Sequence, residues 1–342
     1  MNVAACTTVN VAAGTYAENV IIAHALVLKG AQAGVDARST RGAESTINGG
    51  AGAAITVNAD NVTVDGFTLG GPVSQGSAAI VMMGANSGET IQNTIVNNPG
   101  RAASFNTSAT IFRQNRVVNG TTSGDGFQAN TSPVHDVTLA NNAFGGATAA
   151  AYNADITIIE GNKNIVVTGN SSTRDGTLVA LFKTDGALVS GNTVVGDPSS
   201  SAIYVGGADT NVTVSGNVVS GAGSAVNVAN AFGDGANLNV RITRNTLKGN
   251  VNGVKVGQTA VTGSSVVVAN RNILTGNSTA GVNNLSSIQV DATCNWWGAK
   301  DGPGPIGPGS GDKVTANVTF SPWLRSTDLD HPCNAQDESE GS

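Results

Sequence analysis

Two stretches of the sequence place a basic side chain beside a carboxylate and could therefore transfer protons. His135 directly precedes Asp136, and a histidine next to a carboxylate can be tuned for general acid–base chemistry. Arg174-Asp175 and Lys183 fall within one repeat of the pattern described below, so they could share an edge. An arginine or lysine there could remove the C5 proton of a uronic acid. For His135-Asp136 the alternative is a pair of ordinary polar residues at the start of the Val137-Thr-Leu139 strand. For Arg174-Asp175 and Lys183 the alternative is surface ion pairing on loops.

Three arginines form a candidate ligand-binding strip. Arg244 and Arg271 hold the same place relative to a repeated asparagine, and Arg241 lies three residues before Arg244. If successive repeats stack, these side chains would present a cationic strip suited to an anionic polysaccharide. The alternative is that like charges in stacked positions turn outward and are solvated.

No metal site and no cofactor are predicted. The Gly-Gly-x-Gly-x-Asp repeat of calcium-binding β-helices is absent from the chain. Calcium would enter only if the protein were a lyase that uses the cation to neutralise a substrate carboxylate.

These residues would be positioned by a strand, corner and strand pattern that returns along most of the chain. A representative copy is Asn211-Val-Thr-Val-Ser-Gly-Asn217-Val-Val, and the copies recur about every 25 residues. Such a period without helical segments predicts a β-solenoid. Asparagines stacked about 4.8 Å apart at a buried bend can hydrogen-bond to one another. The predicted ladder consists of Asn115, Asn142, Asn170, Asn192, Asn217, Asn245, Asn272 and Asn295.

A further short apolar stretch between corners gives three strands per repeat. The sequence therefore predicts an all-β fold, a right-handed parallel β-helix with three parallel sheets and about ten to eleven coils. We expect a single domain over residues 1–325 that ends in a cap at 294–325, followed by a flexible acidic tail at 326–342.

The last coil differs from the others in its aromatic residues. Trp296, Trp297 and Trp323 are expected to close the open end of the solenoid, because unpaired edges and apolar interior would otherwise face water. Stacking on sugars is the alternative role. A disulfide between Cys294 and Cys333 would pin the tail onto the last coil, and the alternative is three unpaired thiols.

Composition narrows the classes of partner. The net charge of −6 and the 12% of charged residues argue against nucleic-acid binding, which needs clustered lysine and arginine. No apolar run is long enough for a membrane span. The chain begins without the features of a signal peptide, and we expect that one has been removed from a secreted or cell-surface protein. The sequence leaves the oligomeric state open.

The chain resembles the pectate-lyase-like superfamily of right-handed parallel β-helix proteins, in particular its exported bacterial members. The resemblance rests on the opening Val9-Asn-Val-Ala-Ala-Gly-Thr-Tyr-Ala-Glu18, the asparagine corners and the ending that starts at Cys294-Asn-Trp-Trp-Gly298. It implies the fold. It does not select an activity, because the scaffold carries lyases, hydrolases, epimerases and adhesins.

The known catalytic motifs of that superfamily are missing. The Asn-Thr-Asp, Gly-His-Gly and Arg-Ile-Lys segments of polygalacturonases do not occur, and the Tyr, His, Asp cluster of alginate enzymes is matched only by His135-Asp136. We therefore predict an exported protein that binds an extended carbohydrate along one face without strong catalysis. The alternatives are a polysaccharide lyase-type enzyme and a structural spacer or adhesin module.

Overall fold

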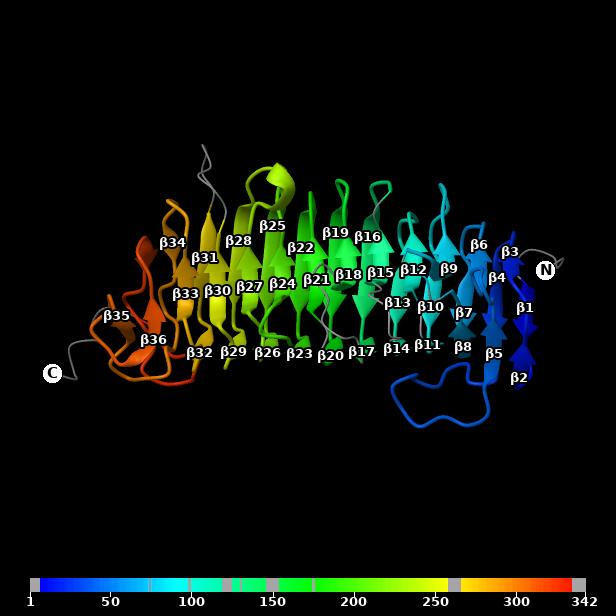
Figure 1. Ribbon diagram of the computed structural model, residues 1–342, viewed down its shortest axis with the longest axis horizontal. Coiled ribbons are helices and arrows are strands. Elements are labelled where there is room, and N and C mark those ends of the chain that lie inside the picture. The colour runs from blue at the N-terminus through cyan, green and yellow to red at the C-terminus, as the bar shows by residue number, and fades with distance from the viewer. Residues whose placement is uncertain are drawn as a thin grey trace. The chain divides into compact units, whose positions relative to one another are not determined.

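The computed structural model describes residues 7–72, 74, 76–97, 100–118, 125–129, 131–145, 154–173, 176–257 and 266–333. These residues form parallel strands, and one short 3-10 helix, η1 (Ala231–Gly233), interrupts a loop (Figure 1). The predicted fold class, a right-handed parallel β-helix with three parallel sheets, is confirmed. Among the described residues, no helix has the length and apolar character needed to cross a bilayer.

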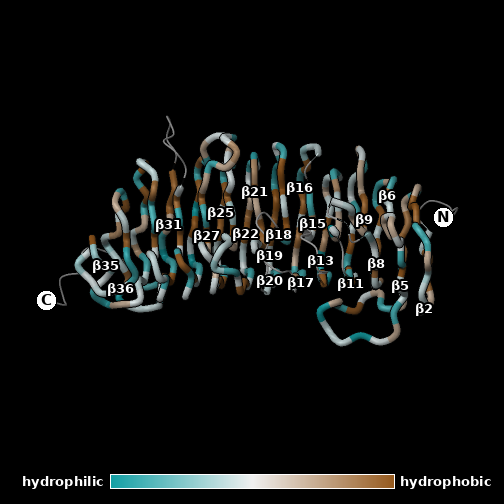
Figure 2. The backbone as a smooth tube through the Cα atoms, viewed as in Figure 1, coloured by the Kyte–Doolittle hydropathy of each residue, from teal (hydrophilic) through white to brown (hydrophobic). Residues whose placement is uncertain are grey.

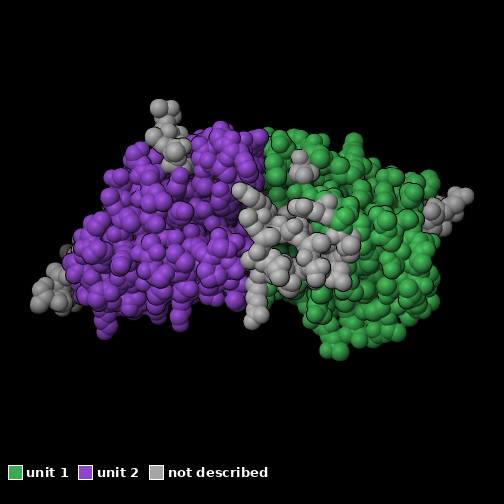
Figure 3. All heavy atoms as spheres, in the orientation of Figure 1, with its two compact units in different colours: residues 1–175 green, residues 176–342 purple. Residues whose placement is uncertain are grey.

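The chain divides into two compact units, Met1–Asp175 and Gly176–Ser342, which Figure 3 shows in different colours. Each unit contains strands of three parallel sheets, here named A, B and C in the order in which the chain visits them. The prediction of one domain over residues 1–325 stays a prediction, and each unit is described by itself below.

In the first unit, every third strand pairs in parallel with the next strand of its own sheet. Sheet A contains β1 (Thr7–Asn10), β4 (Leu26–Lys29), β7 (Thr63–Asp65), β10 (Thr90–Gln92), β13 (Ile111–Arg113), β16 (His135–Ala140) and β19 (Lys163–Thr168). Sheet B contains β2 (Gly14–Tyr16), β5 (Ser45–Asn48), β8 (Phe67–Gly70), β11 (Ile95–Asn97), β14 (Arg116–Val118), β17 (Ala143–Gly145) and β20 (Ser171–Thr173). Sheet C contains β3 (Val20–Ile22), β6 (Ile55–Val57), β9 (Ala78–Met82), β12 (Arg101–Phe105), β15 (Asp125–Ala129) and β18 (Ala154–Ile158).

The second unit repeats this plan. Sheet A contains β22 (Asp185–Ser190), β25 (Thr210–Ser215), β28 (Leu238–Thr243), β31 (Val267–Asn270), β34 (Val290–Asp291) and β37 (Val318–Thr319). Sheet B contains β23 (Thr193–Val195), β26 (Val218–Ser220), β29 (Thr246–Lys248) and β32 (Ile273–Thr275). Sheet C contains β21 (Thr177–Leu181), β24 (Ser201–Val205), β27 (Ser224–Val228), β30 (Asn252–Val256), β33 (Ala280–Asn284), β36 (Gly311–Val314) and β35 (Pro303–Pro305).

The interior is filled by aliphatic side chains from alternate positions of each strand, visible as recurrent apolar segments in Figure 2. Val212 and Val214 of β25, for example, are fully buried, whereas Asn211, which directly precedes Val212, is exposed. The first unit adds a column of aromatic rings: Phe112 lies 5.0 Å from Phe105 and 4.4 Å from Phe127, measured between ring centroids. Stacked coils thus bury like residues on like residues.

The corner between sheets A and B has one backbone conformation in successive coils. The residue before the corner asparagine is left-handed at Gly216, Arg244 and Arg271, where φ is 65°, 57° and 53°. Glycine adopts this conformation without strain, while arginine does so at a cost. The constraint explains why the sequence pattern has glycine or a polar residue at this position.

The asparagines at these corners are buried and hydrogen-bonded from coil to coil. In the second unit, Asn245 Nδ2 donates to Asn272 Oδ1 at 2.9 Å, and the backbone N–H of Asn245 donates to the same oxygen at 3.0 Å. Asn272 is fully buried and repeats both bonds with Asn295. Asn192, Asn217 and Asn245 continue the column, and in the first unit Asn115, Asn142 and Asn170 form another.

The tryptophans assigned to the cap lie in the last coil of the second unit. Trp297 is fully buried and Trp323 is 9% exposed, whereas Trp296 is half-buried. Trp323 Nε1 donates to the carbonyl of Lys300 at 3.1 Å. These positions exclude broad ring faces for sugars on Trp297 and Trp323, and a capping role stays a prediction.

Replacing Asn272 by alanine is expected to lower the free energy of unfolding by about 2–5 kcal/mol, because it strands buried donors on Asn245 and removes three donations of its own. Urea denaturation followed by circular dichroism measures the loss. Asn270→Ala, a half-buried asparagine two residues away in β31, is the matched control and is expected to change stability by less than about 0.5 kcal/mol. Equal losses in the two variants would contradict the interpretation.

Candidate functional site

A row of polar side chains lies on the outer face of sheet C in the second unit. Tyr204, Asn227, Lys255 and Asn283 are register partners in the neighbouring strands β24, β27, β30 and β33. Their strand neighbours Val226 and Val254 point inward and are fully buried, so alternation turns the polar row toward solvent. Adjacent members are separated by one strand spacing, about 4.8 Å. We call these four residues the sheet C row.

Amide hydrogen bonds hold part of this row in place. Asn227 Nδ2 donates to Ser201 Oγ at 3.1 Å, and Asn283 Nδ2 donates to Asn252 Oδ1 at 2.9 Å. Asn227 Oδ1 is buried and has no hydrogen-bond partner among the described residues. A buried acceptor without a partner favours a site where a hydroxyl donor can bind.

An aromatic cluster lies at one end of the sheet C row. The ring of Phe182 is 5.8 Å from Tyr204 and 5.6 Å from Phe232, measured between centroids. Phe182 is almost buried, but Phe232, in η1, is 78% exposed. An exposed phenylalanine that packs on Phe182, which in turn contacts Tyr204, offers an apolar surface beside polar groups.

The predicted base Lys183 lies next to this cluster, at the corner between sheets C and A. Its Nζ is 3.3 Å from Asp234 Oδ1, and its backbone N–H donates to the carbonyl of Gly207 at 2.9 Å. Asp234 belongs to the same loop as Phe232, so the ion pair joins this loop to a corner two coils earlier. The other predicted members of this site, Arg174 and Asp175, lie outside the described residues.

Asp209 is a buried carboxylate at the same corner. Its Oδ1 accepts from the N–H of Thr184 at 2.9 Å, and its Oδ2 accepts from the N–H of Gly207 at 3.2 Å. The side chain is fully buried, and burial raises its pKa from 3.8 to about 6, since the backbone donors offset only part of the desolvation. Sequence analysis passed over Asp209 as a loop residue. The sequence signal for Asp209 was that it occupies the same place in its repeat as Asn237 in the next one. In the structure, Asn237 Oδ1 accepts from the N–H of Asp209.

His135 and Asp136 belong to the first unit and lie in the open. His135 Nδ1 is 2.8 Å from Asp136 Oδ2, and the two side chains are 62% and 56% exposed. The hydrogen bond from His135 lowers the pKa of Asp136, with a second bond from Asn164 Nδ2 to Oδ1. Both residues are exposed at the start of β16, which fits the alternative of ordinary polar residues at the start of a strand. The catalytic assignment of both residues stays a prediction.

The three arginines of the predicted strip do not share one surface. Arg241 lies on the outer face of sheet A, as the register partner of Thr213 and Val268. Arg244 and Arg271 stack at the corner between sheets A and B, where the N–H of Arg244 donates to the carbonyl of Arg271 at 2.9 Å. The strip is therefore a pair at the corner with a separate arginine on sheet A.

The chain's own C-terminal segment contacts that arginine pair. Arg244 Nη2 is 2.6 Å from Asp330 Oδ1, and Arg271 Nη1 donates to the carbonyl of Leu329 at 2.6 Å. A disulfide joins Cys294, in the last coil, to Cys333, with their Cα atoms 5.7 Å apart. We call residues 326–333 the strap. This first part of the predicted flexible tail is tied to the last coils by the disulfide, the ion pair and hydrogen bonds from Arg271. Residues 334–342 lie outside the described residues.

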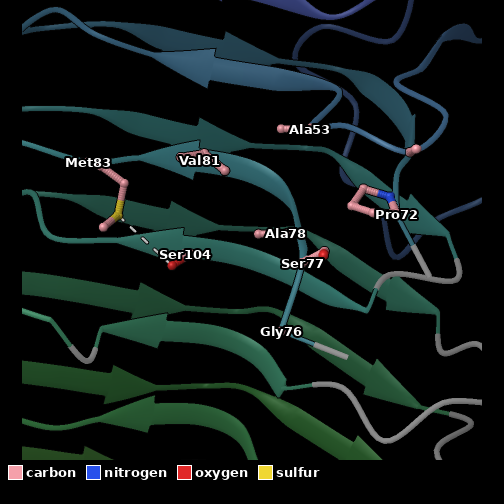
Figure 4. Close-up of a pocket in the computed structure, with 9 residues that line it drawn as sticks. Ala53, Pro72, Gly76, Ser77, Ala78, Val81, Met83 and Ser104 are labelled. Carbon is pink, nitrogen blue, oxygen red and sulfur yellow. Dashed lines mark hydrogen bonds between the residues drawn. The ribbon is translucent and has the colours of Figure 1, made fainter. Parts of the chain in front are cut away.

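A shallow groove in the first unit is the site shown in Figure 4. Its volume is about 390 Å³, and Figure 4 shows Pro72, Met83 and Ser104 around it. The Ser104 hydroxyl is 4.0 Å from the sulfur of Met83, and no charged side chain lines the groove. Among the described residues, no group of three or more His, Cys, Asp or Glu side chains is arranged to hold a metal ion.

Sequence analysis missed most of the sheet C row. None of its four members was assigned a role from the sequence. The signal was available, because each of these residues is the fourth position of the third strand in its repeat. The position stands out only once the strands are in register.

Comparison with solved structures supports the fold. The chain is similar to the A-module of the mannuronan C-5 epimerase AlgE6 from Azotobacter vinelandii, with 16% sequence identity, a TM-score of 0.57, and coverage of 93% of this chain and 90% of that module. It is also similar to a double mutant of the tailspike protein of E. coli bacteriophage HK620 in complex with a pentasaccharide, with 11% identity, a TM-score of 0.51, and coverage of 85% of this chain and 62% of that chain.

The sequence itself matches no protein-family model and no curated protein. The structural likenesses therefore concern the fold alone, a right-handed parallel β-helix.

The raised pKa of Asp209 predicts a pH-dependent stability. The pKa of Asp209 is about 6 in the folded protein and near 3.8 in the unfolded chain. The protonated carboxyl therefore favours the folded state at low pH, and this contribution to stability is lost as the pH rises through about 6. Asp209→Asn removes that dependence. Between pH 4 and pH 8 the variant is expected to gain about 3 kcal/mol relative to the wild type, measured by urea denaturation.

The starting offset between the two proteins at pH 4 reports a different effect, the loss of the acceptor for the N–H of Gly207. The change of the difference with pH therefore isolates the carboxyl. A difference that stays constant from pH 4 to pH 8 would show that Asp209 ionises as readily in the folded protein as in the unfolded chain.

Proposed function

We propose that the protein binds an extended carbohydrate across the outer face of sheet C in its second unit. The observation that carries the proposal is the sheet C row, in which a phenol, two amides and an ammonium recur at one strand spacing in register. A polymer of sugars also repeats its hydroxyl groups along one axis, so one array of polar groups can contact successive sugars.

The chemistry of the row suits hydroxyl groups. Amides donate and accept at the same time, a phenol does so as well, and an ammonium donates. The buried Oδ1 of Asn227 adds an acceptor whose hydrogen-bonding capacity is unfilled in the described part of the chain. Sugar hydroxyls, which donate and accept, complement such a set.

The aromatic cluster supplies the apolar part of the proposed contact. Phe232 exposes most of its ring and packs on Phe182, which in turn contacts Tyr204. Because both ends of the Lys183–Asp234 ion pair lie in the loops beside these rings, the cluster is held in position before a ligand arrives. Preorganised side chains lose less conformational entropy on binding than mobile ones.

The similar structures are consistent with this proposal without carrying it. The epimerase module bears the name of an enzyme that acts on mannuronan, and the tailspike was solved with a pentasaccharide. The proposal for this chain is binding, and the Lys183–Asp234 pair is assigned a supporting role in it.

Two substitutions test the proposal with little risk to folding, because both remove exposed or half-exposed atoms. Phe232→Ala and Lys255→Met are each expected to weaken binding to the preferred polysaccharide by about fivefold or more. A panel of neutral and acidic polysaccharides in pull-down and calorimetric titration would first identify that ligand. Val218→Ala and Lys248→Met are matched controls on sheet B of the same unit, where no loss is expected.

Failure of the wild-type protein to bind any polysaccharide of the panel would refute the proposal. Binding that is unchanged in Phe232→Ala and Lys255→Met would place the ligand elsewhere, and equal losses in the sheet B controls would mean that the effect is general.

A further inference from the structure

A cavity of about 430 Å³ lies in the second unit between the end of the last coil and the strap. It is lined by Lys300, Trp323, Leu324, Arg325, Ser326, His331 and Pro332. The lining comes from three segments: the turn before β35, the residues that follow the last sheet A strand, and the strap itself. None of these residues belongs to the sheet C row.

Three basic side chains meet at this cavity. Lys300, Arg325 and His331 all line it, and among the residues that the structure describes no carboxylate does. Within the described ranges, none of the three forms an ion pair, and the nearby acid Asp330 is engaged by Arg244. Although the protein has a net charge of −6, this cluster of basic side chains without ion-pair partners is a locally basic region. Such a cluster attracts an anion into the space between the bases.

Arg325 adds a more specific signal. Its Nε is buried and has no hydrogen-bond partner in the part of the chain that the structure describes. A buried guanidinium N–H without an acceptor is costly, and a planar guanidinium matches the two oxygens of a carboxylate. A ligand oxygen that accepts from Arg325 would remove this cost.

A disulfide and several hydrogen bonds hold the walls of the cavity in place. The disulfide from Cys333 to Cys294 anchors the strap beside Pro332, and Arg271 Nη1 holds the carbonyls of Leu329 and His331 at 2.6 and 3.3 Å. On the opposite side, Trp323 Nε1 donates to the carbonyl of Lys300, and the N–H of Leu324 donates to the backbone carbonyl of Asn295 at 3.0 Å. The bases are therefore positioned before a ligand binds.

We propose that this cavity is a binding site for a compact oxyanion, such as the carboxylate of an acidic sugar. Arg325 and Lys300 provide the charge-assisted hydrogen bonds, and the disulfide-held strap closes the site. The site is separate from the sheet C row and does not depend on carbohydrate binding there.

Calorimetric titration of the full-length oxidised protein with glucuronate, glucose and inorganic sulfate tests the proposal. Glucuronate is expected to bind and glucose is not, and sulfate is expected to compete with glucuronate. Arg325→Gln and Lys300→Gln are each expected to weaken glucuronate binding by about tenfold. Arg116→Gln, which removes the same charge from sheet B of the first unit, is the matched control and is expected to bind like the wild type.

The strap gives a second readout. Cys294→Ser with Cys333→Ser, or reduction of the wild type, frees the wall and is expected to weaken glucuronate binding while leaving polysaccharide binding at the sheet C row unchanged. Lys300→Gln changes an exposed side chain, so it tests the site even if Arg325→Gln does not fold. Absence of glucuronate binding, equal binding of glucose, or binding that survives both charge-removing variants would overturn the proposal.

Discussion

The hydrogen bonds between buried asparagines of successive coils are the interaction on which the structure depends. Each corner asparagine must occupy the same place as its predecessor, because its Oδ1 accepts both the backbone and side-chain N–H of the asparagine before it. A coil whose corner shifted by one residue would bury unpaired amides and turn its apolar side chains outward. The column therefore fixes the register at the corner between sheets A and B, and the bonds from Asn250 to Asn277 do the same between sheets B and C. Rows such as Tyr204, Asn227, Lys255 and Asn283 follow from that register.

Each unit covers part of its corner between sheets A and B with another segment of chain. In the first unit this segment is the loop after β4, which projects from the strands in Figure 1. Its Arg41 Nη1 donates to the carbonyl of Asn93 at 2.6 Å, and its Ala37 N–H donates to the carbonyl of Gln114 at 3.1 Å. In the second unit the strap contacts Arg244 and Arg271. These corners serve internal packing in both units. Candidate binding groups therefore remain on sheet C and in the cavity under the strap.

The fold could be read from the sequence because its cause is periodic. The spacing of Asn192, Asn217 and Asn245 carries the architecture without knowledge of any contact, and the residues that precede them reveal the left-handed corner. The candidate sites could not be read in the same way. Arg271 and Leu329 are far apart in sequence, and only the folded chain shows that the guanidinium of Arg271 donates to the backbone carbonyl of Leu329. Likewise, Lys300, Arg325 and His331 come from separate segments with no shared period.

The direction of the asparagine column has a consequence for how the chain is made. The Oδ1 of each asparagine completes the donors of the coil before it, so Asn217 is satisfied only when Asn245 is in place, and Asn245 only when Asn272 is. A nascent chain emerging from the ribosome N-terminus first would always end in one unfinished coil. Asn295 is the last member of this column in the second unit, and it donates to the carbonyls of Ala269 and Ala292 at 2.6 and 2.7 Å. The strands made after it, β36 and β37, then pair with the edges of β33 and β34.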